Sequence, residues 1–133
     1  CMEKYEQLLN MLMDFNESVR FGAVCNPQGE ILWHTQREGV KNIVPYEDTK
    51  QTILRAIDAW RGNSKIKDHV GKGLYSITSY EKIKRISIPL DDGNTLFISI
   101  NNEPPSKTKT KSYGQLAEMG KILSIVDFIK SKK

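Results

Sequence analysis

The sequence predicts an α+β fold with a single five-stranded antiparallel sheet, strand order 2-1-5-4-3, in the element order α-β-β-α-β-β-β-α. Residues 19–35 alternate apolar and polar side chains around a short turn, which indicates a hairpin, and residues 74–101 contain three more strand-like segments. Sequential strands usually pair, so the helical segment between the two groups predicts strands 1 and 5 at the centre. We expect the terminal helices on one face of the sheet and the middle helix on the other face or at its edge.

The N-terminal segment is typical of a helix in a soluble protein and not of a signal peptide. Residues 2–18 are expected to be helical because apolar side chains recur every three or four residues, at Tyr5, Leu8, Leu9, Leu12 and Phe15. Charged Glu3, Lys4 and Glu6 precede any apolar segment, and no apolar run in the chain reaches the about 18 residues that span a bilayer. We therefore expect a cytoplasmic protein with no membrane segment.

The hairpin 19–35 has a turn whose residues explain its geometry. Pro27 fixes φ at one turn position, and Gly29 can adopt the positive φ that such a turn requires. The shortness of the connection predicts antiparallel pairing. On the second strand, alternation places Ile31 and Trp33 on the same face of the sheet.

The middle of the chain is expected to be a long connection, 36–47, followed by a helical segment, 48–70. Asp48 is the expected N-cap, because Gln51 follows at the spacing of a capping box. The buried stripe of this helix is predicted to comprise Ile53, Leu54, Ile57 and Trp60. Glycines at 62, 71 and 73 interrupt the segment without forming a phosphate-binding motif.

Residues 74–101 are expected to form a meander of three strands, 74–81, 82–90 and 95–101. The run Asp-Asp-Gly-Asn at 91–94 is a strong hairpin turn between the last two. The final strand is predicted to be central, because its apolar side chains alternate along one face, at Leu96, Ile98 and Ile100.

The C-terminal part is predicted to be a linker, 102–111, and a helix, 112–130. The helix is apolar on more than one face, which predicts two neighbours: the sheet or the first helix, and a partner subunit. The chain has 133 residues and a net charge of +4, and segment 103–133 accounts for the whole excess with seven lysines against three acids. Because this segment contains no arginine, nucleic-acid binding is not expected, and the length indicates one domain, 1–133.

No catalytic constellation, metal site or cofactor site is predicted. The two histidines, His34 and His69, do not have the clustered spacing of metal ligands, and Cys25 is expected to be a buried apolar side chain. Asp91 and Asp92 are explained by the turn that contains them. We therefore expect a protein that is not an enzyme.

Two segments resemble the Roadblock/LC7 family, which has a profilin-like fold. VRFGAVCNPQGEILWHT, which begins at Val19, is similar to the opening hairpin of that family, and RISIPLDDGNTLFISIN, which begins at Arg85, is similar to its closing pair of strands. The resemblance covers residues 3–129. It implies a non-catalytic homodimer that serves as a scaffold or regulator of a small Ras-like GTPase.

The resemblance also implies a dimer interface in which edge strand 74–81 and helix 48–61 pair across a two-fold axis. The candidate interface residues are Ile53, Ile57, Trp60, Tyr75, Ile77 and Tyr80. The chain departs from the family pattern in its long connection, 36–47, and in its extended linker, 102–111.

Two alternatives fit the same order of elements. The chain is also similar to PAS and related sensor domains, which implies a small-molecule ligand in a cavity built mainly by the helical segment, here 48–70. Residues 19–101 are slightly short for a PAS domain. The third alternative is a stand-alone archaeal protein that keeps only the shared architecture.

Overall fold

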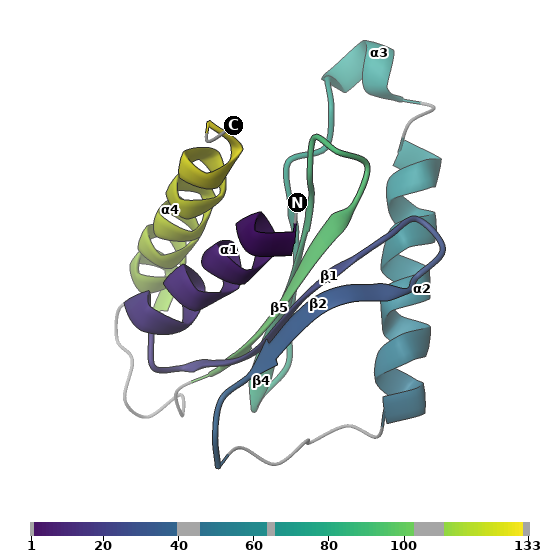
Figure 1. Cartoon of the computed structure of the whole chain (residues 1–133). Coiled ribbons are helices and arrows are strands. Elements are labelled where there is room, and N and C mark those ends of the chain that lie inside the picture. The colour runs from purple at the N-terminus through teal and green to yellow at the C-terminus, as the bar shows by residue number, and fades with distance from the viewer. Residues whose placement is uncertain (1, 40–45, 64–65, 103–110, 132–133) are drawn as a thin grey trace.

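A computed structural model describes residues 2–39, 46–63, 66–102 and 111–131. Within these residues, four helices and five strands follow one another (Figure 1): α1 (Met2–Phe15), β1 (Val19–Cys25), β2 (Ile31–Gln36), α2 (Tyr46–Asn63), α3 (Lys67–Val70), β3 (Ser76–Ser79), β4 (Ile83–Pro89), β5 (Thr95–Asn101) and α4 (Lys111–Lys130). None of these helices, within the residues described, is long and apolar enough to cross a membrane.

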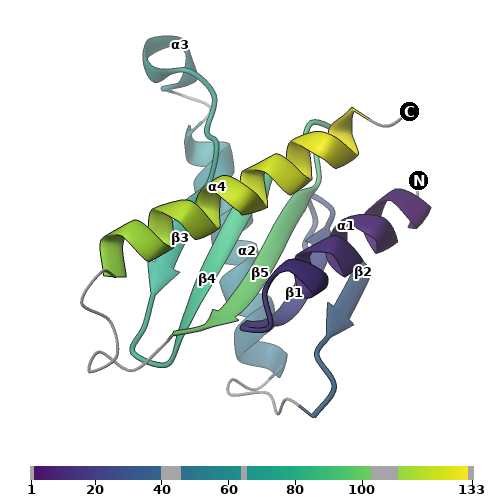
Figure 2. The same ribbon diagram turned by 90° about the vertical axis from the view of Figure 1, so that its left-hand side faces the viewer.

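The strands form one antiparallel sheet in the order β2-β1-β5-β4-β3, which confirms the predicted topology. Helices α1 and α4 lie on one face, and α2 lies on the opposite face (Figures 1 and 2). The short α3 projects beyond the sheet. β2 and β3 are therefore the two edges of the sheet.

The larger core lies between the sheet and the α1–α4 layer. Strand β5 contributes Leu96, Ile98 and Ile100, all of which are buried, as its alternation predicts. The helices contribute apolar side chains at helical spacing, at Tyr5, Leu8, Leu9, Leu12, Met119, Ile122, Val126 and Ile129. This layer is the main source of hydrophobic stabilisation, because buried apolar area contributes about 25 cal/mol per Å².

A smaller core lies on the other face, where α2 packs on the sheet. Ile53 and Ile57 of α2 contact Ala23 and Cys25 of β1, and all four side chains are buried. The pKa of the Cys25 thiol is raised to about 11 because burial disfavours the thiolate. This confirms the expectation of a buried cysteine at this position.

Cys25 should therefore react very slowly with iodoacetamide in the folded protein. With a pKa of about 11, only about one thiol in a thousand is ionised at pH 8, and the thiolate is the reactive form. In a Cys1→Ser variant, mass spectrometry should show alkylation at least about a hundredfold slower in buffer than in guanidinium chloride. Equal rates in the two solutions would contradict the burial of this side chain.

Two helices, α1 and α2, have a boundary at least two residues from the predicted one, and a local hydrogen bond explains the boundary of α1. α1 ends at Phe15 and not at 18, because the Asn16 side chain accepts a hydrogen bond from the Ser18 amide at 2.8 Å. α2 begins at Tyr46, so the prediction of Asp48 as N-cap is wrong. The backbone carbonyl of Asp48 instead accepts a hydrogen bond from Thr52 Oγ1 within the helix, at 2.9 Å.

A β-bulge overturns one prediction about the hairpin. The register of β1 and β2 shifts between Val24, which pairs with Trp33, and Cys25, which pairs with Ile31. A bulge inserts one extra residue, so Ile31 joins the core under α2 while Trp33 packs against the larger core on the other face. The expectation that these two side chains share a face is therefore wrong.

Strand β3 is shorter than predicted, and two connecting segments are described only in part. β3 spans Ser76–Ser79, shorter than the predicted 74–81. Of the connection 36–47, residues 40–45 lie outside the described residues, as do residues 103–110 of the linker 102–111.

Polar side chains fix α1 and α4 to the sheet. Lys84 Nζ of β4 lies 2.5 Å from Glu118 Oε1 of α4, and both side chains are largely buried, with exposed fractions of 11% and 16%. Asn16 Nδ2 donates to Glu118 Oε2 at 2.7 Å. At the other end, the Tyr5 hydroxyl donates to the Asp92 carboxylate, and the pKa of Tyr5 is raised by burial and by this hydrogen bond. Polar contacts at both ends thus hold the α1–α4 layer in addition to its apolar packing.

Candidate functional site

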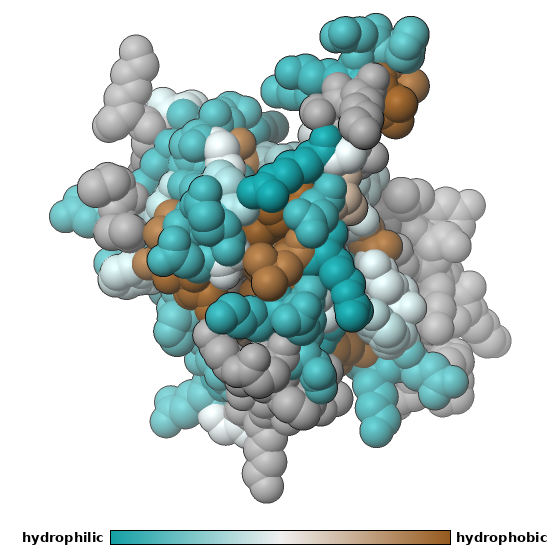
Figure 3. All heavy atoms as spheres, turned by 90° about the vertical axis from the view of Figure 1, so that its right-hand side faces the viewer, coloured by the Kyte–Doolittle hydropathy of each residue, from teal (hydrophilic) through white to brown (hydrophobic). Residues whose placement is uncertain are grey.

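An open groove of about 740 Å³ lies between α2 and the sheet. Figure 3 views the molecule from this side and shows recessed apolar atoms between polar ones. α2 packs on the sheet at β1 and β5, and residues of all five strands line the groove beside it. Its volume is in the range of about 300–1,000 Å³ that is usual for small-molecule sites.

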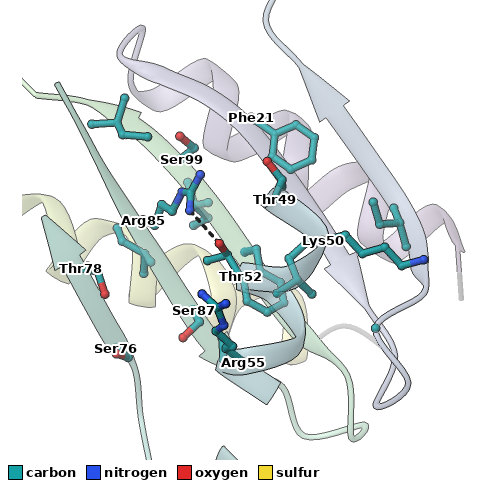
Figure 4. Close-up of a pocket in the computed structure, with 18 of the residues that line it drawn as sticks. Phe21, Thr49, Lys50, Thr52, Arg55, Ser76, Thr78, Arg85, Ser87 and Ser99 are labelled. Atoms are coloured by element: carbon teal, nitrogen blue, oxygen red, sulfur yellow. Dashed lines mark hydrogen bonds between the residues drawn. The ribbon is translucent and has the colours of Figure 1, made fainter. Parts of the chain in front are cut away.

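The groove is open because small side chains face each other across it. On α2, small residues recur at helical spacing along the groove, at Thr49, Thr52, Ala56 and Ala59, beside the larger Lys50, Ile53, Arg55 and Trp60. On the sheet, the facing positions carry hydroxyl groups, at Ser76, Thr78, Ser87 and Ser99 (Figure 4). Larger apolar residues at these positions would fill the space, so the small side chains leave the groove open.

The strand register explains how these hydroxyl groups come together. Arg85 of β4 lies opposite Thr78 of β3 and Ser99 of β5, and Ser99 lies opposite Phe21 of β1. Directly opposed residues share a face of the sheet, so these four side chains form one row across it. The opposite face of the same strands has isoleucines at 86, 88, 98 and 100, all of which are buried.

Among the described residues, four cations line the groove, Arg20, Lys50, Arg55 and Arg85. Two of them, Arg85 and Arg55, come from its two walls (Figure 4). Arg85 comes from β4: its Nη1 donates to Thr52 Oγ1 at 3.2 Å, and its Cζ lies 5.9 Å from the centre of the Tyr80 ring. Arg55 comes from α2 and, among the described residues, has no hydrogen-bond or ion-pair partner. No aspartate or glutamate is found among the described lining residues, so the groove is electropositive.

The groove has an aromatic component as well. Phe21 stacks on His34 of β2, with ring centroids 6.3 Å apart and an angle of 28° between the rings. Phe97 lies in the floor, and Trp60 closes one end, where its Nε1 donates to Ser87 Oγ at 3.2 Å. The groove thus combines flat apolar surfaces with cations and hydroxyl donors.

The structure separates the six candidate interface residues into three kinds. Ile53 and Ile57 are buried beneath α2, with exposed fractions of 4% and 5%. Tyr75 and Tyr80 flank β3 and are 40% and 52% exposed. The other two, Trp60 and Ile77, are half-buried; Trp60 lines the groove and Ile77 packs against the core on the opposite face.

The side chains that could carry chemistry do not converge. No group of three or more His, Cys, Asp or Glu side chains with the geometry of a metal site is found within the described part of the chain. His34 lies in the groove, His69 lies in α3, and Cys25 is buried in the smaller core. The groove is therefore suited to binding through arginine and hydroxyl groups.

Three groove residues, Ile53, Trp60 and Tyr80, are among the predicted interface residues, but the arginine and hydroxyl side chains were not predicted as a site. Arg55 and Arg85 occupy positions where polar residues are common, on a helix and on an alternating strand. Whether they lie close together depends on where α2 lies over the sheet. The available signal was the set of Ser and Thr side chains at alternate positions of three neighbouring strands, because a face that is fully buried would carry apolar residues there.

A scan against protein families and a search of curated proteins find no match. Solved structures do match. The gliding protein MglB from Thermus thermophilus has a TM-score of 0.61 at 12% identity, over 94% of this chain and 90% of that chain. An MglB described as having a tetrameric arrangement has a TM-score of 0.61 at 12% identity, over 96% and 90%. A Roadblock/LC7 domain from Streptomyces avermitilis has a TM-score of 0.62 at 7% identity, over 92% of each chain. The chain therefore has the Roadblock/LC7 fold, as the resemblance implied.

Proposed function

We propose that this chain is a non-catalytic, cytoplasmic regulatory module that forms a homodimer through β3 and α2 and binds a protein partner. The partner class that the resemblance implies is a small Ras-like GTPase. The observation that carries the proposal is the edge strand β3, which is flanked by the exposed rings of Tyr75 and Tyr80. The tetrameric arrangement of the MglB neighbour supports self-association in this fold.

The backbone of β3 is available for pairing with a second strand. The Tyr80 amide donates to the Ile83 carbonyl at 2.7 Å, which identifies residues 80, 78 and 76 as the positions that bond to β4. The alternation of an antiparallel ladder then directs the amides of Ile77 and Ser79 to the open edge. Such an edge is a template for a further strand, and two copies paired there would form one continuous sheet.

Ser79→Pro should weaken the homodimer at least about tenfold, because proline removes an outward amide without touching the ladder to β4. Tyr75→Glu should act in the same direction by placing a carboxylate beside the paired edge. Sedimentation velocity over a concentration series would measure the dissociation constant. Circular dichroism would show that each variant remains folded.

Two control variants locate the interface. Gln36→Pro places proline on the other edge strand, β2, at a position whose amide also points outward, since the Arg37 amide bonds to the Arg20 carbonyl. Phe128→Glu changes an exposed ring on α4, 48% exposed, into a carboxylate. A dimer that survives Ser79→Pro and Tyr75→Glu but dissociates with Phe128→Glu would place the interface on α4 and overturn the proposal.

A further inference from the structure

We propose that the α3 arm, residues 66–74, packs on a second copy of this chain, with Leu74 against Tyr80 of the partner subunit. This inference rests on the proposed homodimer and extends it, because the arm lies outside the pairing of β3 and α2. Each copy would then contribute an apolar arm to the other.

The arm carries apolar side chains that the described part of the chain does not cover. α3 has no buried residue, and every residue from 66 to 74 is exposed. Ile66, Val70 and Leu74 are at least half exposed, and Figure 3 shows apolar atoms at the top of the molecule, where α3 projects. The Val70 amide donates to the Ile66 carbonyl at 3.1 Å, so one helical turn places these two side chains on the same side of the arm.

The base of the arm is fixed to the rest of the chain. A Cβ atom at Gly73 would collide with the ring of Trp60, so the backbone of the arm passes directly against that ring. Lys72 Nζ lies 3.9 Å from Asp91 Oδ1, in the turn between β4 and β5. An arm held at its base presents its apolar side chains at a defined place, which lowers the entropy cost of binding.

Antiparallel pairing of two β3 strands would bring Leu74 of one copy to Tyr80 of the other. The outward amides belong to Ile77 and Ser79, so the registers that pair most of β3 join Ile77 to Ile77 or to Ser79 of the partner subunit. Tyr80 of the partner subunit then lies opposite residue 74 or residue 76. Leu74 and this exposed ring are neighbours in both registers, and the two-fold axis repeats the contact at the other end of the paired strands.

The size of β3 also favours a contribution from the arm. β3 has four residues, whereas a stable protein interface involves about 20–30 residues from each partner. The arm precedes β3 directly in the chain, so it extends the paired edge without a break. Burying its apolar side chains would stabilise the homodimer in a way that two short strands cannot.

The charges of the arm favour a second copy over a strongly charged partner. The arm carries two lysines and one aspartate, and one of these lysines, Lys72, is paired with Asp91. Tyr80 is followed by Glu81 and Lys82, whose charges cancel. Neither surface therefore carries an excess of charge that would repel the other.

Cross-linking of single-cysteine variants tests the contact between copies. In the full chain with Cys1→Ser, the variants Leu74→Cys and Tyr80→Cys are mixed above the dimer dissociation constant and treated with a short bismaleimide. Cys25 is buried and reacts slowly, and the two chains differ in mass, so mass spectrometry identifies each product. We expect the mixed product to exceed both self-linked products at least about tenfold, because pairing raises the effective concentration of one thiol near the other.

The matched control for cross-linking replaces Leu74→Cys by Lys121→Cys. Lys121 is exposed on α4, on the face of the sheet opposite α2 (Figure 2). Its mixed product with Tyr80→Cys should not exceed the background from random collisions.

Two charge variants measure how much the arm contributes to the homodimer. Val70→Glu and Leu74→Glu each place a carboxylate in the proposed apolar contact and should weaken the homodimer at least about tenfold in sedimentation velocity. Both side chains are exposed, so circular dichroism should show an unchanged fold. Phe128→Glu is the matched control, since it makes the same change at an exposed ring on α4 and should leave the dissociation constant unchanged.

Three outcomes would overturn the inference: a mixed product no more abundant than the self-linked products, unchanged dissociation constants in both arm variants, or equal weakening by Phe128→Glu. If Ser79→Pro dissociates the homodimer while both arm variants leave it intact, the pairing through β3 stands and only the arm contact fails. A wild-type chain that is monomeric at every concentration would contradict the proposed homodimer, and the arm contact with it.

Discussion

Replacing Lys84 with methionine should lower the free energy of unfolding by about 3–5 kcal/mol, the cost of leaving a buried charge without its partner. Glu118 Oε1 is buried and, among the described residues, has no hydrogen-bond donor other than the Lys84 ammonium group. Methionine has a similar length and fills the same space, so the substitution creates no cavity. The loss in the free energy of unfolding is therefore due to the removed charge. Chemical unfolding followed by circular dichroism would measure it, at one fixed protein concentration, because the proposed dimer would make stability depend on concentration.

The double variant Lys84→Met with Glu118→Met tests whether the unpaired charge of Glu118, and not another effect of the substitution, causes the loss of stability. Once both charges are removed, the pair becomes apolar, and we expect most of the lost stability to return. The double variant also loses the hydrogen bond that Asn16 Nδ2 donates to Glu118 Oε2 at 2.7 Å. The free energy of unfolding should therefore stay about 1 kcal/mol below that of the wild type. A double variant no more stable than Lys84→Met would show that burial of this carboxylate is not the source of the effect.

Ile122→Ala should lower the free energy of unfolding by about 2–5 kcal/mol. Ile122 is fully buried, at 0% exposure, where α4 packs on the sheet, so truncation leaves a cavity in the larger core. Ile66→Ala is the matched control, because the same atoms are removed from a side chain that is 50% exposed; its cost should stay within about 0.5 kcal/mol. Similar losses for both variants would show that α4 does not pack on the sheet as described.

The fold could be predicted because the strands carry a strong period-two signal. In β5, Leu96, Ile98 and Ile100 alternate with Phe97 and Ser99, and the structure places the two sets on opposite faces. A slip of one residue would expose the whole apolar set, so such a pattern specifies both strand and register. The turn at 91–94 and the helical crossover then leave few topologies.

Features that depend on one side-chain hydrogen bond or one extra residue could not be predicted in the same way. The end of α1 depends on the Asn16 side chain, and the divergence of Ile31 and Trp33 depends on a bulge that the sequence does not mark. The groove depends on where α2 lies over the sheet, which its periodicity does not specify. The PAS-like alternative expected a cavity built mainly by segment 48–70, whereas the sheet contributes at least as many of the groove residues.

The placement of α1 and α4 on one face and α2 on the other determines the shape of any particle built through β3 (Figure 2). Two antiparallel edge strands are related by a two-fold axis perpendicular to the sheet, so both copies present the same face in the same direction. The resulting dimer would be flat, with α1 and α4 of both copies covering one face. On the other face, the α2 helices and the two grooves would lie side by side. A protein bound to the α2 face and centred on the two-fold axis would contact both copies at once. Its stoichiometry would then be one partner to two chains.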